Sequence, residues 1–426
     1  MRKIRLSLLA ATVLVAGMSS MSYANPLEEI FSDGKYSIEI RPRYEFVDQD
    51  GKSKNANAFT VRTALSAQVG LLGVEGLGAQ IQMINVANFG NEKYNPNPAN
   101  ADISNYPVVV DPDQTRVTQA NISYSANGFV GIVGRKMVVL DNARFIGNVG
   151  WRQMPQTYDL AAVMYNGIEN LSLLGAYVNR VHRVTDNGKI DSGSVLLHAS
   201  YKVMPELTIT AYDYMIQNFA DHIGIRATGT IELDMAKLKY TAEYAKQTDP
   251  TMTDDDDTIL PIIQNLGVTD PDNIDQDSDY YNIAIDATID AFIVGLGYEV
   301  LGDDGNKAKG TAFITPLATL HAMNGWADKF LLGTPPEGLR DFTIKAGYNA
   351  GEFGKLIAIY HNFTSDRKRA GNDDLGNELD IAYKYKITKN LGLLLKYANY
   401  NAGDTAFGYT DTTKYWVQLD YKFKSE

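Results

Sequence analysis

Residues 36–46, YSIEIRPRYEF, alternate strictly between apolar or aromatic side chains and polar side chains. A period of two is typical of a β-strand whose two faces meet different surroundings. A run of this length can also cross a lipid bilayer, because a tilted transmembrane strand needs about 9–11 residues. The stretch therefore predicts a membrane-spanning strand with one lipid-facing side and one polar side.

The same alternation recurs along the chain. The clearest further segments are residues 59–69, 237–244, 281–289, 378–387 and 417–423. Read in order, the chain offers about 18 such strands, joined by links that alternate between short and long, as in outer-membrane barrels. The expected fold class is all-β: a transmembrane antiparallel β-barrel of about 18 strands, with long extracellular loops partly folded into the lumen.

An even number of strands places both ends of the barrel on the periplasmic side, where the short turns lie. Two of the predicted strands, near residues 171–184 and 223–230, alternate only weakly. Long connections are expected near residues 48–57, 88–114, 138–157, 184–191, 217–222, 248–279, 302–338, 364–377 and 401–412.

Composition narrows the possible functions. The 426 residues contain no cysteine, which excludes a disulfide scaffold, a cysteine-ligated metal site and a cysteine nucleophile. The net charge of −12 argues against a nucleic-acid partner, whose phosphates need a basic surface. A hydrophobic fraction of 45% fits either a soluble protein or a barrel whose lipid-facing residues are diluted by polar lumen residues.

The N-terminus predicts the compartment. Arg2, Lys3 and Arg5 precede an apolar or small stretch from Leu6 to Met18, and small residues lie at the end of residues 1–24. This order is typical of a secretory signal peptide. We expect residues 1–24 to be the signal peptide and residues 25–426 to form a single barrel domain in the bacterial outer membrane.

The polar faces of the strands and the long connections carry candidate pore residues. A barrel of this size encloses an aqueous lumen, and loops can narrow it. Cationic side chains there would select anionic solutes. The candidate lumen cations are Arg41, Arg43, Arg62, Arg135, Arg144, Arg152, Lys237 and Lys239. The alternative is that such cations simply pair with lumen carboxylates: Glu39, Glu45, Glu243 and Asp286.

Two segments are candidates for loops that constrict the pore. Residues 134–159 are rich in glycine, asparagine and arginine, whereas residues 313–342 are too apolar for a loop in water. Burial of both inside the lumen would cover the apolar side chains. The candidate constriction residues are Asp141, Trp151, His321, Trp326 and Asp328.

These segments also resemble a known family. Four segments are similar in sequence to the alginate-export type of outer-membrane barrel: LDNARFIGNVGWRQMPQTYD (140–159), AEYAKQTD (242–249), GYEVLGDDG (297–305) and FITPLATLHAMNGWADKFL (313–331). Two shorter segments are also similar, YHNF (360–363) and NELD (377–380). The resemblance implies an 18-stranded channel of porin kind, which in some members passes an anionic polysaccharide.

One long connection is strongly acidic. Residues 254–279 hold nine aspartates and neither lysine nor arginine. Aspartates at alternate positions suggest a calcium loop, but Tyr280 stands where the calcium loop needs glycine. We expect a solvated external loop and no metal site.

Other function classes have weaker support. An outer-membrane hydrolase would need an activated nucleophile beside a histidine, and the available pairs are His361 with Asp366 and His321 with Asp328. Recognised catalytic motifs are absent. A structural or adhesive barrel is the remaining alternative. We expect a passive channel for small, anionic or polyhydroxyl solutes, surrounded by membrane lipid, without catalytic residues or cofactor. We also expect Arg144→Glu or Arg152→Glu to weaken its anion preference.

Overall fold

The computed structural model describes residues 31–89, 93–97, 103–185, 189–253, 276–303, 312–331 and 334–425. The predicted signal peptide, residues 1–24, and most of the acidic connection, residues 254–275, lie outside the described residues. Within the described part of the chain, no helix is long and apolar enough to cross a membrane.

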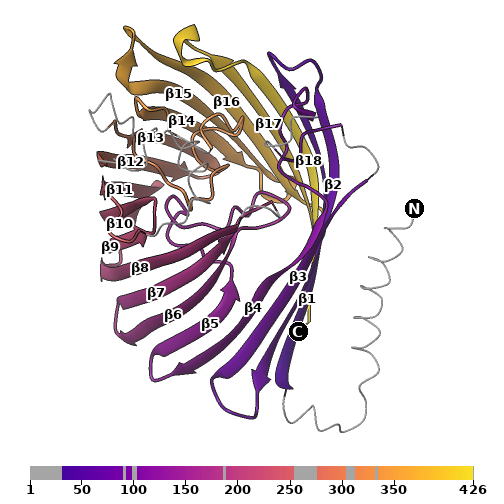
Figure 1. The fold of residues 1–426 in the computed structure, drawn as a ribbon, viewed down its shortest axis with the longest axis vertical. Coiled ribbons are helices and arrows are strands. Elements are labelled where there is room, and N and C mark those ends of the chain that lie inside the picture. The colour runs from indigo at the N-terminus through magenta and orange to yellow at the C-terminus, as the bar shows by residue number, and fades with distance from the viewer. Residues whose placement is uncertain are drawn as a thin grey trace.

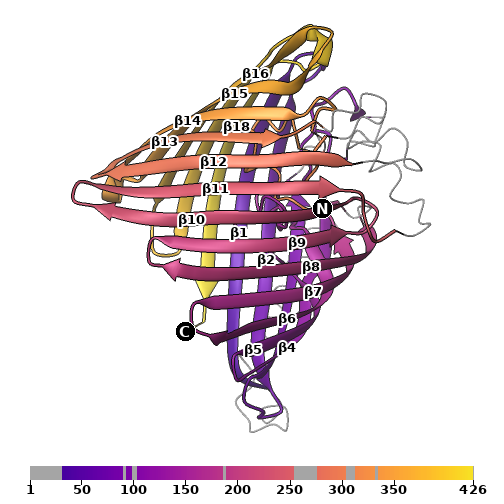
Figure 2. The ribbon, with the colours of Figure 1, turned by 90° about the vertical axis from the view of Figure 1, so that its left-hand side faces the viewer.

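A single 18-stranded antiparallel sheet closes on itself because β1 pairs with both β2 and β18. Figure 2 shows the strands following one another around the wall in chain order. The strands are β1 (Phe31–Gln49), β2 (Ala56–Leu71), β3 (Leu77–Asn88), β4 (Gln114–Ala126), β5 (Phe129–Lys136), β6 (Thr157–Ile168), β7 (Leu171–His182), β8 (Lys189–Met204), β9 (Leu207–Ile216), β10 (Ala220–Leu233), β11 (Ala236–Thr248), β12 (Asp277–Ile289), β13 (Phe292–Leu301), β14 (Leu339–Asn349), β15 (Lys355–Arg369), β16 (Asn372–Lys386), β17 (Leu391–Ala402) and β18 (Thr412–Lys424). The described residues also include two short 3₁₀ helices, η3 (Gly351–Phe353) and η4 (Thr405–Phe407). The predicted fold class is confirmed, including the two weakly alternating strands β7 and β10.

The short turns lie together at one end of the barrel, as predicted. Asn127 and Gly128 form one of them with φ angles of 50° and 82°, the left-handed conformation that a two-residue hairpin turn requires. Phe31 pairs with Leu71 at this end. The C-terminal end of β18 reaches the same end, so both ends of the barrel lie on the short-turn side.

Two predicted long connections are wrong. Residues 217–219 alone join β9 to β10, and Ala370 and Gly371 alone join β15 to β16. Both residues of the second turn have positive φ, 51° and 91°, so the strands continue into a tight hairpin. The polar residues around it resemble a loop in sequence because a strand that projects beyond the membrane has two solvated faces.

The outward face of the barrel is apolar. On β12, Tyr281, Ile283 and Ile285 are 45%, 65% and 45% exposed. Neighbouring outward positions repeat this pattern around the wall, whereas a water-soluble monomer rarely exposes so large a continuous apolar patch. The outward face is therefore a lipid-contacting belt.

The lumen contains two inward loops, which we call loop A (residues 137–156) and loop B (residues 312–331). Figure 1 shows both inside the ring of strands. The Gly147 N–H donates to the Leu317 carbonyl at 2.8 Å, and the Thr319 N–H donates to the Ala143 carbonyl at 2.9 Å. A Cβ on Gly147 would lie 2.7 Å from the Thr319 nitrogen, so only glycine permits this approach.

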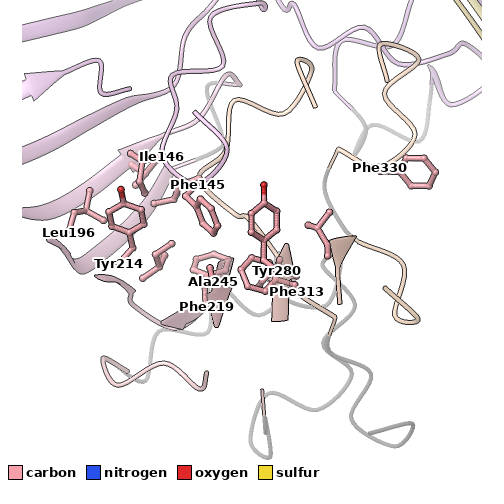
Figure 3. Close-up of a cluster of buried hydrophobic side chains, with 14 of the residues drawn as sticks. Phe145, Ile146, Leu196, Tyr214, Phe219, Ala245, Tyr280, Phe313 and Phe330 are labelled. Atoms are coloured by element: carbon pink, nitrogen blue, oxygen red, sulfur yellow. The ribbon is translucent and has the colours of Figure 1, made fainter. Parts of the chain in front are cut away.

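Aromatic side chains bury one side of the two loops against the wall. Phe145 of loop A lies 5.1 Å from Tyr212, 5.3 Å from Tyr280 and 5.9 Å from Phe313, measured between ring centroids. We call these four residues the aromatic cluster, and Figure 3 shows Phe145 close to Tyr280 and Phe313. The expectation that the apolar residues of loop B are buried in the lumen is confirmed.

Candidate pore and its constriction

Loop A is tied to several parts of the barrel wall by charged side chains. Asp141 accepts a hydrogen bond from His198 of β8 at 3.2 Å and lies 3.5 Å from Arg226 of β10. Arg144 forms a 3.0 Å ion pair with Glu299 of β13. The loop therefore extends across the lumen and is fixed on its far side.

Arg152 joins the two loops and the wall near β1. Its guanidinium lies 3.2 Å from Glu45, 2.9 Å from Asp328 and 3.7 Å from Asp111, while Lys414 donates to Asp328 at 2.6 Å. Burial opposes the charge on Arg152, but the three carboxylates raise its pKa above the ordinary value. Burial likewise opposes ionisation of Asp328, yet its cationic neighbours hold its pKa well below the usual range. Both groups are therefore charged and fully engaged at neutral pH.

All three tryptophans of the chain surround one lysine. The Lys396 ammonium of β17 lies 4.0, 3.6 and 5.1 Å from the ring centroids of Trp151, Trp326 and Trp416. Such cation–π contacts stabilise a charge that has left water. The group joins loop A, loop B and the wall, since each supplies one tryptophan. We call it the tryptophan cage.

His321 completes the tryptophan cage. Its ring stacks on Trp151 at 4.5 Å, Nδ1 lies 2.6 Å from Asp328 and Nε2 lies 2.8 Å from the Lys396 ammonium. Because an ammonium can only donate, Nε2 must be the acceptor, and Nδ1 then carries the proton given to Asp328. Burial lowers the pKa of His321 well below its ordinary value, which agrees with this neutral form.

The predicted arginines of the strands all face the lumen, and all have partners there. Arg41 pairs with Asp420, Arg62 with Glu39, and Arg135 with Asp159. Arg43 donates to Gln418 and to the Trp151 carbonyl, and its guanidinium lies 4.0 Å from the Trp151 ring centroid. These side chains hold the wall and the tip of loop A together.

The predicted lysines of β11 lie apart from the constriction. Lys237 pairs with Glu232 across the periplasmic turn that joins β10 to β11. Lys239 shares the inward face of β11 with Glu243, and its register partner on β12 is Asp286. Asp286 instead accepts hydrogen bonds from Lys345 of β14. The structure therefore does not bring Lys237 and Lys239 together with the arginines of loop A.

Two cavities lie on either side of the loop A tip. The extracellular cavity, of about 380 Å³, is lined by Arg152, Lys329 and Lys414 among its charged residues. The periplasmic cavity, of about 740 Å³, is lined by Trp151 and by wall residues near the short turns. The consecutive residues Trp151 and Arg152 thus separate the two cavities and mark the constriction.

Neither candidate catalytic histidine has the surroundings of a hydrolase. Both ring nitrogens of His321 are occupied, one by Asp328 and one by Lys396. His361 contacts Asp341 and Asp380, not the predicted Asp366, which instead binds Arg340. Each histidine therefore serves in a buried charge network.

No family model matches the sequence, and no curated protein matches it. Among solved structures, OccAB4 of Acinetobacter baumannii superposes with a TM-score of 0.72 at 13% identity, covering 94% of this chain and 100% of that one.

Two structures from Pseudomonas aeruginosa are similarly close. The outer membrane protein OpdK gives a TM-score of 0.71 at 13% identity, covering 93% of this chain and 100% of that one. OccK8 (OprE) gives 0.69 at 15% identity, covering 92% and 99%. The chain has the fold of an outer-membrane porin. These likenesses concern the porin-type barrel and do not single out the alginate-export type.

Several residues of the constriction were not predicted from the sequence. Lys396, Lys414 and Asp111 all contribute to the charge network, and Arg183 lines a third cavity beside the loops. Lys396 carried a usable signal, because it lies on the polar face of β17 between outward Leu395 and Tyr397. Asp111 and Arg183 lie in connections between strands, where no periodicity indicates whether a side chain faces the lumen.

Proposed function

We propose that this protein is a passive outer-membrane channel for small anionic solutes, with its constriction at the tip of loop A. The observation that carries the proposal is the charge of the two cavities beside that tip. Three basic side chains and one acidic side chain line the extracellular cavity. Four basic and two acidic side chains line the periplasmic cavity. An excess of cationic lining on both sides favours anions along the whole path.

The periplasmic cavity contributes most of the free positive charge. Lys355, Lys384 and Lys386 form no ion pair with any residue that the structure describes. Lys355 and Lys384 are also register partners on neighbouring strands. Like charges placed opposite each other are unfavourable unless water or an anion screens them. These lysines are therefore available to a passing solute in a way that the paired arginines are not.

Small solutes fit this lumen better than an extended polysaccharide. A polyuronate needs a continuous series of available cations, one for each carboxylate. Here Arg144 and Arg152 are already bound to carboxylates, and the aromatic cluster fills part of the lumen. Alginate export remains the second candidate, supported by the resemblance of residues 313–331 to that type of barrel.

Reversal potentials in planar lipid bilayers test the proposal. Under a KCl gradient, the reversal potential of the reconstituted protein should have the sign expected of an anion-selective pore. Lys384→Glu should weaken that anion preference. Lys389→Glu, in the turn after β16, makes the same charge change outside the cavity and should have a smaller effect. Cation selectivity of the unaltered protein would overturn the proposal. Block of the current by uronate oligomers at concentrations that leave monomeric uronate without effect would favour the polysaccharide alternative.

A further inference from the structure

A third cavity, of about 160 Å³, lies beside the constriction on its extracellular side. It is lined by the Arg152 and His321 side chains, by three polar residues, Asn97, Gln156 and Thr185, and by five aliphatic residues. These are Val110, Val149, Val184, Leu320 and Leu331. A cavity of about 150 Å³ accommodates a molecule the size of benzene. The space therefore suits a compact body of about six non-hydrogen atoms.

Arg183 supplies the charge at this cavity. It follows β7, is partly buried, and lines the cavity directly. Its guanidinium makes no hydrogen bond and no ion pair with any residue in the described ranges, and its neighbour is the neutral phenol of Tyr158. Burial lowers the pKa of Arg183 below its ordinary value, and no carboxylate among the described residues offsets this effect.

The contrast with Arg152 in the same cavity is informative. Arg152 is surrounded by three carboxylates, so it has no need of a further anion. A guanidinium taken out of water without a counter-charge is unfavourable by several kcal/mol unless an anion or water compensates it. Arg183 is partly removed from water, has no counter-charge among the described residues, and lies next to a space that a small molecule can enter.

We propose that this cavity binds a small organic carboxylate, with the carboxylate held by the Arg183 guanidinium and the apolar body packed against the valine and leucine side chains. The planar fork of arginine binds a carboxylate bidentately. The five aliphatic side chains favour an apolar body over that of a polyhydroxyl acid such as a uronate, because hydroxyl groups placed against them would lose water. The inference rests on the proposed function and refines it by naming a solute class and a binding residue.

Binding of pentanoate to the full-length protein in detergent tests this site. Thermal unfolding midpoints measured against pentanoate concentration should give saturable binding, at least tenfold tighter than for 1-pentanol or glucuronate. Arg183→Met should weaken pentanoate binding at least tenfold, and Arg183→Lys should restore part of it. Arg340→Met, which removes an arginine already paired with Asp366 at the rim, should leave the affinity unchanged. If Arg183→Met does not fold, Arg183→Gln takes its place.

Two outcomes would overturn the site. One is equal affinity of the unaltered protein and the Arg183 variant for pentanoate, and the other is equal affinity for pentanoate and 1-pentanol. The binding measurement needs no conduction. Failure of the reconstituted protein to conduct anions would therefore count against the proposed channel function, whereas failure to bind pentanoate would count against this cavity alone.

Discussion

The two inward loops are held in the lumen by two regions that rely on different interactions. The aromatic cluster around Phe145 packs loop A and loop B against β9 and β12 by burying ring surfaces, with few charges involved. Across the lumen, the tryptophan cage and Arg152 hold the same loops through ion pairs and cation–π contacts. The first region resembles an ordinary protein core. The second is polar enough to lie beside the path of a charged solute, although its arginine is already paired with carboxylates.

The largest expected effect comes from reversing the charge of Arg152. Arg152→Glu would place a fourth carboxylate beside Glu45, Asp111 and Asp328, and breaking a buried pair of this kind costs about 3–5 kcal/mol. We expect the loops to open locally, with hydrogen exchange of the Gly147 amide accelerated by roughly two to four orders of magnitude. This replaces the simpler expectation that the substitution only weakens anion preference.

The control for Arg152 is a pair of similar chemistry at the rim. Arg340 and Asp366 form a 2.6 Å ion pair in which Arg340 is 43% exposed. Exposed pairs contribute about 0–1 kcal/mol. Arg340→Glu should leave exchange at Gly147 unchanged. If the exchange rate were also unchanged in Arg152→Glu, the ion pairs of Arg152 would not be what holds the loops in place.

A smaller effect is expected in the aromatic region. Phe145→Ala removes a buried ring from between Tyr212, Tyr280 and Phe313, which costs about 3 kcal/mol or slightly more. Exchange at the Thr319 amide should accelerate, while the anion preference stays as it was because no charge is altered. Phe129→Ala, at an outward position that is 52% exposed, provides the control. Loss of selectivity without faster exchange would show that the two regions are not separate in function.

The smallest expected effect is a pH dependence at the extracellular cavity. Burial lowers the pKa of Lys329, which lies in loop B and lines this cavity, to about 8. Lys329 is therefore charged below that pH and neutral above it, so anion preference should decline as the pH rises from 7 to 9. Reversal potentials across this range measure the change. Lys329→Met should remove the pH dependence, and a dependence that persists in the variant would assign it to another group.

Much of the wall could be read from the sequence because a strand carries its own signal. In residues 36–46 each side chain is assigned to a face by parity alone, and membrane and lumen then require opposite chemistry on the two faces. The lengths of the connections between strands were harder to predict from the sequence. The polar residues near Ala370 look like a loop, but turn conformation decides where a hairpin ends.

The constriction was only partly predictable, for a related reason. The composition of loop B indicated burial. The sequence also offered Arg152 as a lumen cation and Trp151 and His321 as constriction residues, and all three line cavities in the lumen. Their partners were not foreseeable, since Glu45, Asp111 and Lys414 come from distant parts of the chain. Whether a lumen arginine is free or paired depends on which residues of the barrel wall lie next to its guanidinium.

By itself, the sequence determined an antiparallel barrel of about 18 strands, an apolar outside, a polar lumen and two loops too irregular or too apolar to remain in water. These properties follow from local periodicity and composition, which need no knowledge of long-range contacts. Only the tertiary structure decided which cations are neutralised and which remain available. That outcome depends on distances between residues far apart in the chain, and Coulomb interactions and desolvation vary steeply with such distances. Arg152 and Arg183 line the same cavity, yet Arg152 is paired with three carboxylates whereas Arg183 forms no ion pair with any residue that the structure describes.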